Sequence, residues 1–130
     1  MLSQDPPNAR ILLVEDEFLV AMVAEEALIE FGCTVIGPVD RIEVAIELAE
    51  SEPLDAALLD VNIAGNPVYP VAEVLARRGV PFAFVSGYGA SDPGCPEAYR
   101  AAPVMPKPYG TADIERILAL LLRPAGLAGA

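Results

Sequence analysis

The sequence predicts a single α/β domain with a doubly wound parallel sheet, because short apolar strands alternate with helical segments along the chain. Each strand-like run is apolar on both faces, which is typical of parallel strands that helices cover on both sides. In such sheets, ligands bind at the carboxyl ends of the strands. The expected strands lie near residues 10–14, 33–37, 56–60, 81–86 and 102–105.

Helices are expected between these strands, and several of them carry boundary signals. Asp40 and Glu43 have the spacing of a capping box at the start of a helix. Pro70 suits a first helical turn, and Gly32 and Gly79 suit helix ends. Five strand–helix units of this kind predict a flavodoxin-like (βα)5 fold with strand order 2-1-3-4-5. The expected helices span 17–31, 41–51, 70–78 and 111–122, with a short or irregular one at 91–100.

The length and the first residues predict one cytoplasmic domain. The chain has 130 residues, the size of a single domain, which we expect at 10–122 between tails at 1–9 and 123–130. No apolar run reaches the ~18 residues needed to span a bilayer. The first residues include neither a basic region nor the apolar core of a signal peptide. We therefore expect the protein in the cytoplasm.

The composition excludes several classes of function. The net charge is −11 and the eight Lys and Arg residues are scattered, which argues against a nucleic-acid surface. Histidine is absent, which excludes Ser-His and Cys-His nucleophile pairs and His-ligated zinc. Cys33 and Cys95 lack metal-ligand spacing and are expected to be free thiols. Any chemistry must therefore use carboxylates, a hydroxyl, an amine and a hard metal.

Four of the predicted strands end at, or just before, polar residues. An acid pair, Glu15 and Asp16, follows the first strand, and Asp60 ends the third. Ser86 ends the fourth strand, and Lys107 follows the last. Each residue alone has an ordinary explanation, such as a solvated acid, a strand-ending turn or a surface lysine. Because the carboxyl ends of parallel strands meet at one edge of a sheet, we expect all five side chains to lie together there.

Such a cluster predicts a divalent metal and a phosphorylated aspartate. Unit negative charges ~5 Å apart repel by roughly 3 kcal/mol per pair at an effective dielectric of ~20, and a cation relieves this repulsion. Oxygen ligands alone favour Mg²⁺ or Mn²⁺ over zinc. Asp60 would then be the nucleophile, and Ser86 and Lys107 would stabilise the phosphoryl oxygens. An ionised carboxylate needs no base, so the lack of histidine is no obstacle.

The segments around these residues resemble the receiver domain of two-component response regulators, and the match spans 10–122. They are LVEDE at 13–17, LLDV at 58–61, VSG at 85–87 and MPKP at 105–108. Two longer stretches further resemble the FATGUY subgroup of single-domain receivers. These are PFAFVSGYG at 81–89 and PVMPKPY at 103–109, and Lys107-Pro108 is a candidate cis peptide bond.

The resemblance implies a phosphoprotein of a phosphorelay. Asp60 would accept a phosphoryl group from a sensor histidine kinase or a histidine phosphotransfer protein. The domain would be a signalling protein that catalyses only its own phosphorylation and dephosphorylation. The implied magnesium ligands are the carboxylates of Asp16 and Asp60 and the carbonyl of Asn62, with Glu15 acting mainly through water. The implied phosphoryl contacts come from Ser86 and Lys107.

Three departures from the family pattern are present. The loop after Asp60 is shorter than in most receivers, and Ser86 replaces the commoner Thr while keeping the hydroxyl. Val104 occupies the place of the aromatic switch residue, three before Lys107. We therefore expect switching through ordering of residues 87–100 rather than through burial of an aromatic ring. The expected switch region comprises Gly87, Tyr88, Val104 and Tyr109.

The first helix has apolar residues on more than one side. One stripe, expected to be a partner surface for the helical hairpin of the kinase, consists of Phe18, Met22 and Ile29. An ordinary explanation is that the whole helix is unusually buried. The face expected to pack in the core consists of Val20, Val23, Ala24, Ala27, Leu28 and Phe31.

Two other functions are compatible with parts of this pattern. A protein-interaction module could have kept the fold and lost phosphorylation, although every expected type of site residue is present. A phosphatase of the haloacid dehalogenase type also uses an aspartate, Mg²⁺, Ser or Thr and Lys. That site requires a second acid two residues after the nucleophile, where this chain has Asn62. The phosphatase therefore ranks far below the receiver.

Overall fold

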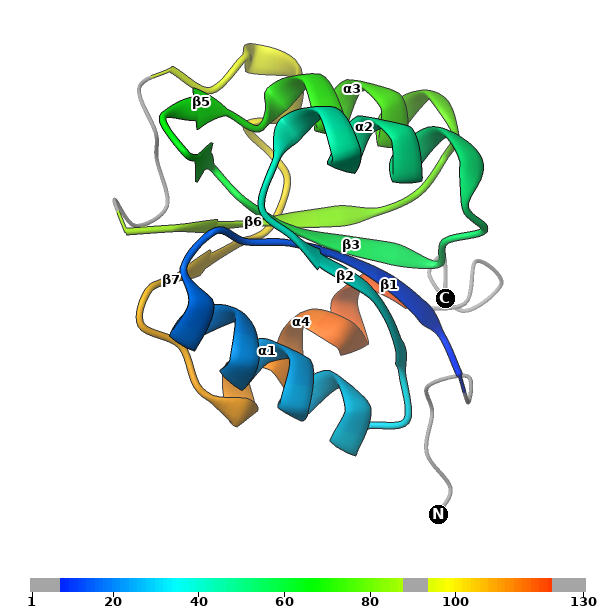
Figure 1. Cartoon of the computed structure of the whole chain (residues 1–130), viewed down its shortest axis with the longest axis vertical. Helices are drawn as coiled ribbons and strands as arrows, with labels where there is room; N and C mark the ends of the chain where they lie inside the picture. Colours follow the sequence, from blue (N-terminus) through cyan, green and yellow to red (C-terminus); the bar gives the residue numbers. More distant parts are fainter. Residues whose placement is uncertain (1–7, 88–93, 123–130) are drawn as a thin grey trace.

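The computed structural model describes residues 8–87 and 94–122, which form a five-stranded parallel sheet between two layers of helices (Figure 1). The order β2-β1-β3-β6-β7 is the predicted order 2-1-3-4-5 when the five sheet strands are numbered along the chain. The sheet strands are β1 (Arg10–Val14), β2 (Thr34–Val39), β3 (Ala56–Asp60), β6 (Phe82–Ser86) and β7 (Val104–Pro106).

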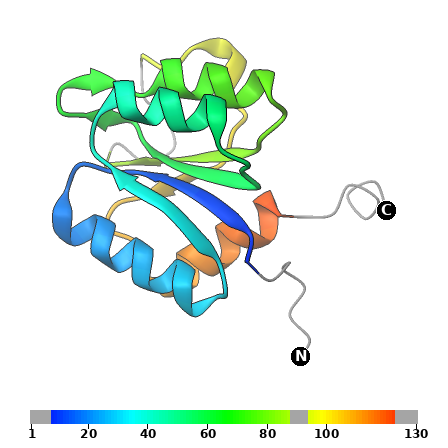
Figure 2. The same ribbon diagram turned by 45° about the vertical axis from the view of Figure 1, so that its right-hand side comes forward.

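The helices cover both faces of the sheet, as the apolar strands predicted. One layer holds α1 (Phe18–Glu30) and α4 (Thr111–Leu121), and the other holds α2 (Ile42–Ser51) and α3 (Tyr69–Arg77) (Figures 1 and 2). Among the described residues, no helix combines the length and the apolar character that a membrane crossing requires. Three short elements complete the description: β4 (Asn62–Ile63), β5 (Asn66–Pro67) and the 3-10 turn η1 (Glu97–Tyr99).

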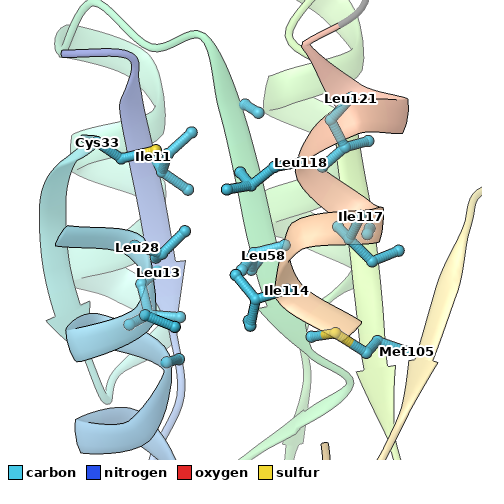
Figure 3. Packing of buried hydrophobic residues seen from close by; sticks show 14 of the residues in the cluster. Ile11, Leu13, Leu28, Cys33, Leu58, Met105, Ile114, Ile117, Leu118 and Leu121 are labelled. Carbon is cyan, nitrogen blue, oxygen red and sulfur yellow. The ribbon is translucent and has the colours of Figure 1, made fainter. Parts of the chain in front are cut away.

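Each helical layer packs on its own face of the sheet. In β3 every residue is buried, so successive side chains enter opposite layers. Leu58 lies with Ile11 and Leu13 of β1 in the layer of α1 and α4 (Figure 3). Leu59 lies in the layer of α2 and α3. The inner face of α4 is apolar, and its residues are all buried: Ile114, Ile117, Leu118 and Leu121.

The turn signals are confirmed at most of the predicted positions. Gly32 and Gly79 have positive φ angles directly after α1 and α3, and Pro70 lies in the first turn of α3. The Lys107-Pro108 peptide bond is cis, as expected, and Gly37-Pro38 is a second cis bond. Cys33 and Cys95 form no disulfide with each other.

One local prediction was wrong. Asp40 and Glu43 form no capping box, because α2 begins one residue later, with Arg41 at the N-cap and no side-chain cap bond. The described part of 91–100 agrees with the short or irregular element expected there, since it contains the 3-10 turn η1, and Gly94 and Pro96 disfavour a longer helix. Residues 91–93 lie outside the described part of the chain, as do most of the predicted tails, 1–7 and 123–130.

The strand predicted at 33–37 instead runs to Val39. Its pairing with β1 shifts between Leu12 and Val14. A Cβ at Gly37, which has φ of 117°, would lie 2.7 Å from the carbonyl oxygen of Leu13. Only glycine tolerates both this approach and this backbone conformation. The irregularity keeps β2 paired with the end of β1, so the acid pair starts from a fixed position.

Candidate functional site

The carboxyl ends of β1, β3, β6 and β7 meet at one edge of the sheet, above an open cleft of about 470 Å³. The register explains the meeting, because Asp60 is level with Val85 and Ser86 is level with Pro106. The predicted convergence of polar side chains is therefore confirmed. The cleft is lined by Asp16, Glu17, Asp60, Val61, Asn62, Gly65, Ser86, Gly87 and Lys107.

Asp60 is a buried carboxylate whose two oxygens have different partners. Its Oδ2 lies 3.0 Å from Nζ of Lys107, and its Oδ1 accepts the N–H of Asn62 over 3.4 Å. Only 6% of the residue is exposed. A buried carboxylate stays ionised only with a cationic partner or a metal. Its position in the cleft leaves it accessible to a small reactant.

The two acids after β1 have different environments. Glu15 is buried, and its Oε2 accepts the N–H of Glu17 over 3.1 Å. Burial and the neighbouring Asp60 raise the pKa of Glu15 from 4.5 to about 7. Asp16 is exposed, and its Oδ2 accepts the N–H of Ala64 over 2.8 Å, which ties the β4–β5 turn to the end of β1.

These carboxylates fit a divalent cation. One oxygen each from Glu15, Asp16 and Asp60 can lie within 4.8 Å of one another. Oxygen donors of this kind suit Mg²⁺ or Mn²⁺. Asn62, whose carbonyl was the fourth expected ligand, lies at the start of β4 and lines the same cleft.

Lys107 is the centre of the ionic contacts in the cleft. Its Nζ lies 2.6 Å from Oε1 of Glu17, 3.0 Å from Oδ2 of Asp60 and 3.2 Å from Oε2 of Glu15. Burial alone would lower the pKa of Lys107, but these carboxylates outweigh it and raise the pKa above its ordinary value. The ammonium is therefore charged at every physiological pH and is available to neutralise a further anion.

Glu17 is a member of the cleft that sequence reasoning did not assign. It occupies the N-cap position of α1 without making a side-chain cap bond. Acids are common at the start of a helix, so the sequence contains no signal that Glu17 belongs to the cleft. Its contact with Lys107 depends on the approach of residues 90 positions apart.

Ser86 and Gly87 complete the cleft at the end of β6. Ser86 is buried, and its carbonyl oxygen accepts the N–H of Lys107 over 3.1 Å. This backbone bond fixes the start of the segment after β7 relative to β6. The hydroxyl and the ammonium thus belong to neighbouring, paired strands, as the strand-end pattern predicted.

The predicted switch region is only partly covered by the described residues. Val104 is half-buried and packs beside an aromatic cluster, defined here as Tyr69, Phe82, Phe84 and Tyr99. Phe82 and Tyr99 meet edge to face with ring centroids 5.8 Å apart. The cluster was not foreseen, because its members come from α3, β6 and η1. Tyr99 supplies an aromatic ring on the face where Val104 has none.

Of the other two switch residues, the structure describes Tyr109 but not Tyr88. The hydroxyl of Tyr109 lies 3.5 Å from the carbonyl oxygen of Val20, and burial raises its pKa. Tyr88 lies outside the described residues. The expected ordering of 87–100 on switching includes 88–93, which lie outside the described residues, and stays a prediction.

The apolar stripe on α1 is exposed, so the helix is not simply buried. Phe18 is 74% exposed, Met22 40% and Ile29 58%. Val23, expected in the core, is exposed instead, because Ala21 takes the inward position. Leu19 is also exposed and widens the stripe at its N-terminal end. This apolar surface adjoins the acidic edge of the sheet, because α1 begins directly after Glu17.

Comparison with known proteins agrees with this fold and site. No family model matches the chain. A solution structure of SdrG from Sphingomonas melonis Fr1 is 40% identical, with a TM-score of 0.76 over 88% of this chain and 97% of that one. A second solution structure, of the BeF3-activated conformation of SdrG from Pseudomonas melonis Fr1, is also 40% identical, with a TM-score of 0.72 over 89% and 98% of the two chains.

Two more distant proteins show the same likeness. The transcriptional regulatory protein PdtaR of Mycobacterium tuberculosis is 28% identical over 109 residues, which cover 81% of this chain and 52% of that protein. The chain thus spans about half the length of the curated relatives it matches. The receiver domain of the sensor histidine kinase PA1611 from Pseudomonas aeruginosa PAO1, which has magnesium coordinated in its active-site cleft, is 23% identical, with a TM-score of 0.71 over 90% and 99% of the two chains.

The solved structures that share the fold include further receiver domains and response regulators. The likeness to SdrG extends over nearly all of that protein, at an identity well above what a shared fold alone requires. It agrees with the acid pair, aspartate, hydroxyl and lysine found together at the sheet edge. The chain belongs to the response regulator receiver domain family of two-component signalling.

Proposed function

We propose that this receiver domain is a phosphoacceptor. Asp60 takes a phosphoryl group from a sensor histidine kinase or a histidine phosphotransfer protein, and the modified domain presents a changed surface to a downstream protein. The observation that carries the proposal is the convergence of a lysine and two further carboxylates on one buried aspartate, Asp60. Lys107 lies 3.0 Å from Asp60, and two further carboxylates lie close enough to share a cation with it.

The transfer follows from the chemistry of these side chains. A carboxylate oxygen of Asp60 attacks the phosphorus of a phosphohistidine, so a P–O bond forms and the P–N bond breaks. The electron pair of that bond leaves with the imidazole nitrogen of the donor. Lys107 and the hydroxyl of Ser86 stabilise charge on the phosphoryl oxygens. Lys107 remains protonated throughout, because its pKa is raised by the carboxylates around it.

Magnesium, or manganese, fits this site. Glu15, Asp16 and Asp60 would hold the cation together with the carbonyl of Asn62, Glu15 mainly through water. When bound, it would offset the charge of the carboxylates and of the incoming phosphoryl group. The magnesium in the receiver domain of PA1611 supports the assignment.

Phosphorylation is expected to require the metal. Incubating the protein with acetyl phosphate and Mg²⁺ should add one phosphoryl group per chain, measured by intact-protein mass spectrometry. Excess chelator should reduce the modified fraction at least tenfold, because the uncompensated carboxylates repel the donor. No modification under either condition would contradict the proposal and favour an interaction module that works unphosphorylated.

The exposed stripe on α1 is proposed as the surface that meets the phosphodonor protein. Phe18→Gln together with Met22→Gln should slow transfer from the kinase roughly tenfold, because two large apolar contacts are lost. Phosphorylation by acetyl phosphate should be unchanged. The measurement is the initial rate with each donor.

Leu120→Gln is the matched control for that experiment. Leu120 is exposed and apolar like Phe18, but it lies near the end of α4, away from the edge that holds Asp60. It should leave both rates unchanged. An equal loss of rate with both donors in the α1 double variant would show damage to the site and reject the proposed surface.

A further inference from the structure

We infer that Glu17 is a positioning residue, which holds Lys107 before phosphorylation and gives it up to the incoming phosphoryl group. The inference rests on the proposed function. Glu17 makes the shortest of the three carboxylate contacts of Lys107, at 2.6 Å against 3.0 Å for Asp60 and 3.2 Å for Glu15. An ammonium group has three donors, so three carboxylates occupy all of them.

A phosphoryl oxygen can gain Lys107 only if one of these partners leaves. The contact with Asp60 passes to the phosphoryl group that this residue carries, because the phosphorylated carboxyl has lost its own charge. A second contact between Lys107 and the phosphoryl group requires the release of Glu15 or Glu17. Glu15 is a poor candidate, since its side chain is 1% exposed and its oxygen also accepts a backbone N–H. Losing the ammonium would leave that buried carboxylate without its charged partner.

Glu17 is the partner that can be released at low cost. Its side chain is 60% exposed, so water replaces the lysine contact as it breaks. Glu17 therefore competes with the phosphoryl group for Lys107 and weakens the phosphorylated state relative to the unphosphorylated one.

The test uses beryllium fluoride, whose tetrahedral BeF3⁻ group binds a carboxylate oxygen in the manner of a phosphoryl group. Its affinity for the magnesium-saturated full chain is measured by isothermal titration calorimetry. Glu17→Gln should bind roughly two- to fivefold more tightly than the unmodified protein, the range set by one exposed ion pair. Glu17→Asp retains the charge with a shorter side chain, and should restore the lower affinity in part.

Two controls separate positioning from general charge. Glu26→Gln removes the same charge from an exposed position further along α1 and should leave the affinity unchanged. In a Lys107→Met background, Glu17→Gln should lose its effect, because the residue acts through the lysine. A structural or purely repulsive role of Glu17 would not depend on Lys107 in this way.

The outcomes distinguish this inference from the proposed function. If the unmodified protein does not bind BeF3⁻ in the presence of Mg²⁺, the phosphoacceptor assignment fails and the inference with it. If it binds, three results would overturn only the role of Glu17. They are an unchanged affinity of Glu17→Gln, a change in affinity equal to that of Glu26→Gln, and an effect of Glu17→Gln that persists in the Lys107→Met background. Thermal unfolding of each variant confirms that it is folded.

Discussion

Asp60→Asn is expected to abolish phosphorylation by acetyl phosphate and by a histidine kinase. The amide has no ionised oxygen to attack phosphorus, and no other carboxylate among the described residues occupies the position of Asp60 at the end of β3. Glu15 is buried under the cleft, with a pKa raised to about 7, and Asp16 is tied to the backbone of Ala64. The phosphorylated fraction, measured by intact-protein mass spectrometry, should fall below one hundredth of that of the unmodified protein.

The fold should survive that substitution. Asparagine has nearly the same volume as aspartate, so the packing of β3 is kept. Lys107 loses one of three carboxylate partners, while the repulsion between Asp60 and Glu15 is removed at the same time. These two changes oppose each other, and we expect the free energy of unfolding to change by about 1 kcal/mol or less. Loss of phosphorylation would therefore report chemistry rather than unfolding.

Asp55→Asn is the matched control. Asp55 directly precedes the same strand at its amino end, and its Oδ2 accepts the N–H of Arg10 over 2.8 Å. Losing this contact should reduce stability slightly, without affecting the cleft at the far end of β3. Undiminished phosphorylation of the Asp60→Asn protein would contradict the assignment of the acceptor and move it to another carboxylate.

The sheet and its order were predictable because their signals are local and redundant. Runs such as 56–59 are apolar throughout, and this pattern is typical of parallel strands that helices cover on both faces. Helix ends were predictable where a glycine must adopt positive φ, as at Gly32 and Gly79. The start of α2 was not, because the pair Asp40 and Glu43 fits a capping box in sequence while the backbone turns into the helix one residue later.

The candidate site was predictable wherever a side chain follows the end of a strand. Asp60 and Ser86 are placed by the register of β3 and β6, which the apolar pattern already implies. The contact of Glu17 with Lys107 is different, because it depends on the exact path of two loops. The aromatic ring that Tyr99 adds beside Val104 comes from a turn with little periodic signal. Contacts between irregular segments leave no trace in hydrophobic periodicity.

Metal-free protein is expected to become more stable as the pH falls from about 7.5 to about 5. The pKa of Glu15 is raised from 4.5 to about 7 in the folded state, mainly by burial and by its neighbour Asp60. Between those values the folded protein binds a proton that the unfolded chain does not bind. Stability is therefore lost as the pH rises toward 7 and gained as it falls. The difference between the two pKa values corresponds to about 3 kcal/mol at most.

The measurement is urea denaturation at several pH values in the presence of a chelator. Other shifted groups do not produce this trend, because the raised pKa values of Lys107 and Tyr109 place their titrations above this range and the lowered pKa of Asp113 places its titration below it. Glu15→Gln should flatten the dependence, since its amide does not titrate. Constant or falling stability of the unmodified protein from pH 7.5 to 5 would contradict the raised pKa of Glu15.

Magnesium should reverse the sign of this dependence. The cation binds ionised carboxylates, so it stabilises the folded protein most where Glu15 has lost its proton. Saturating Mg²⁺ should add little near pH 5 and progressively more stability above pH 7. Asp60→Asn should weaken the effect, because it removes one of the three carboxylates that surround the cation. The pH at which metal begins to stabilise the protein then reports the ionisation of Glu15, and links the electrostatics of the cleft to the chemistry proposed for Asp60.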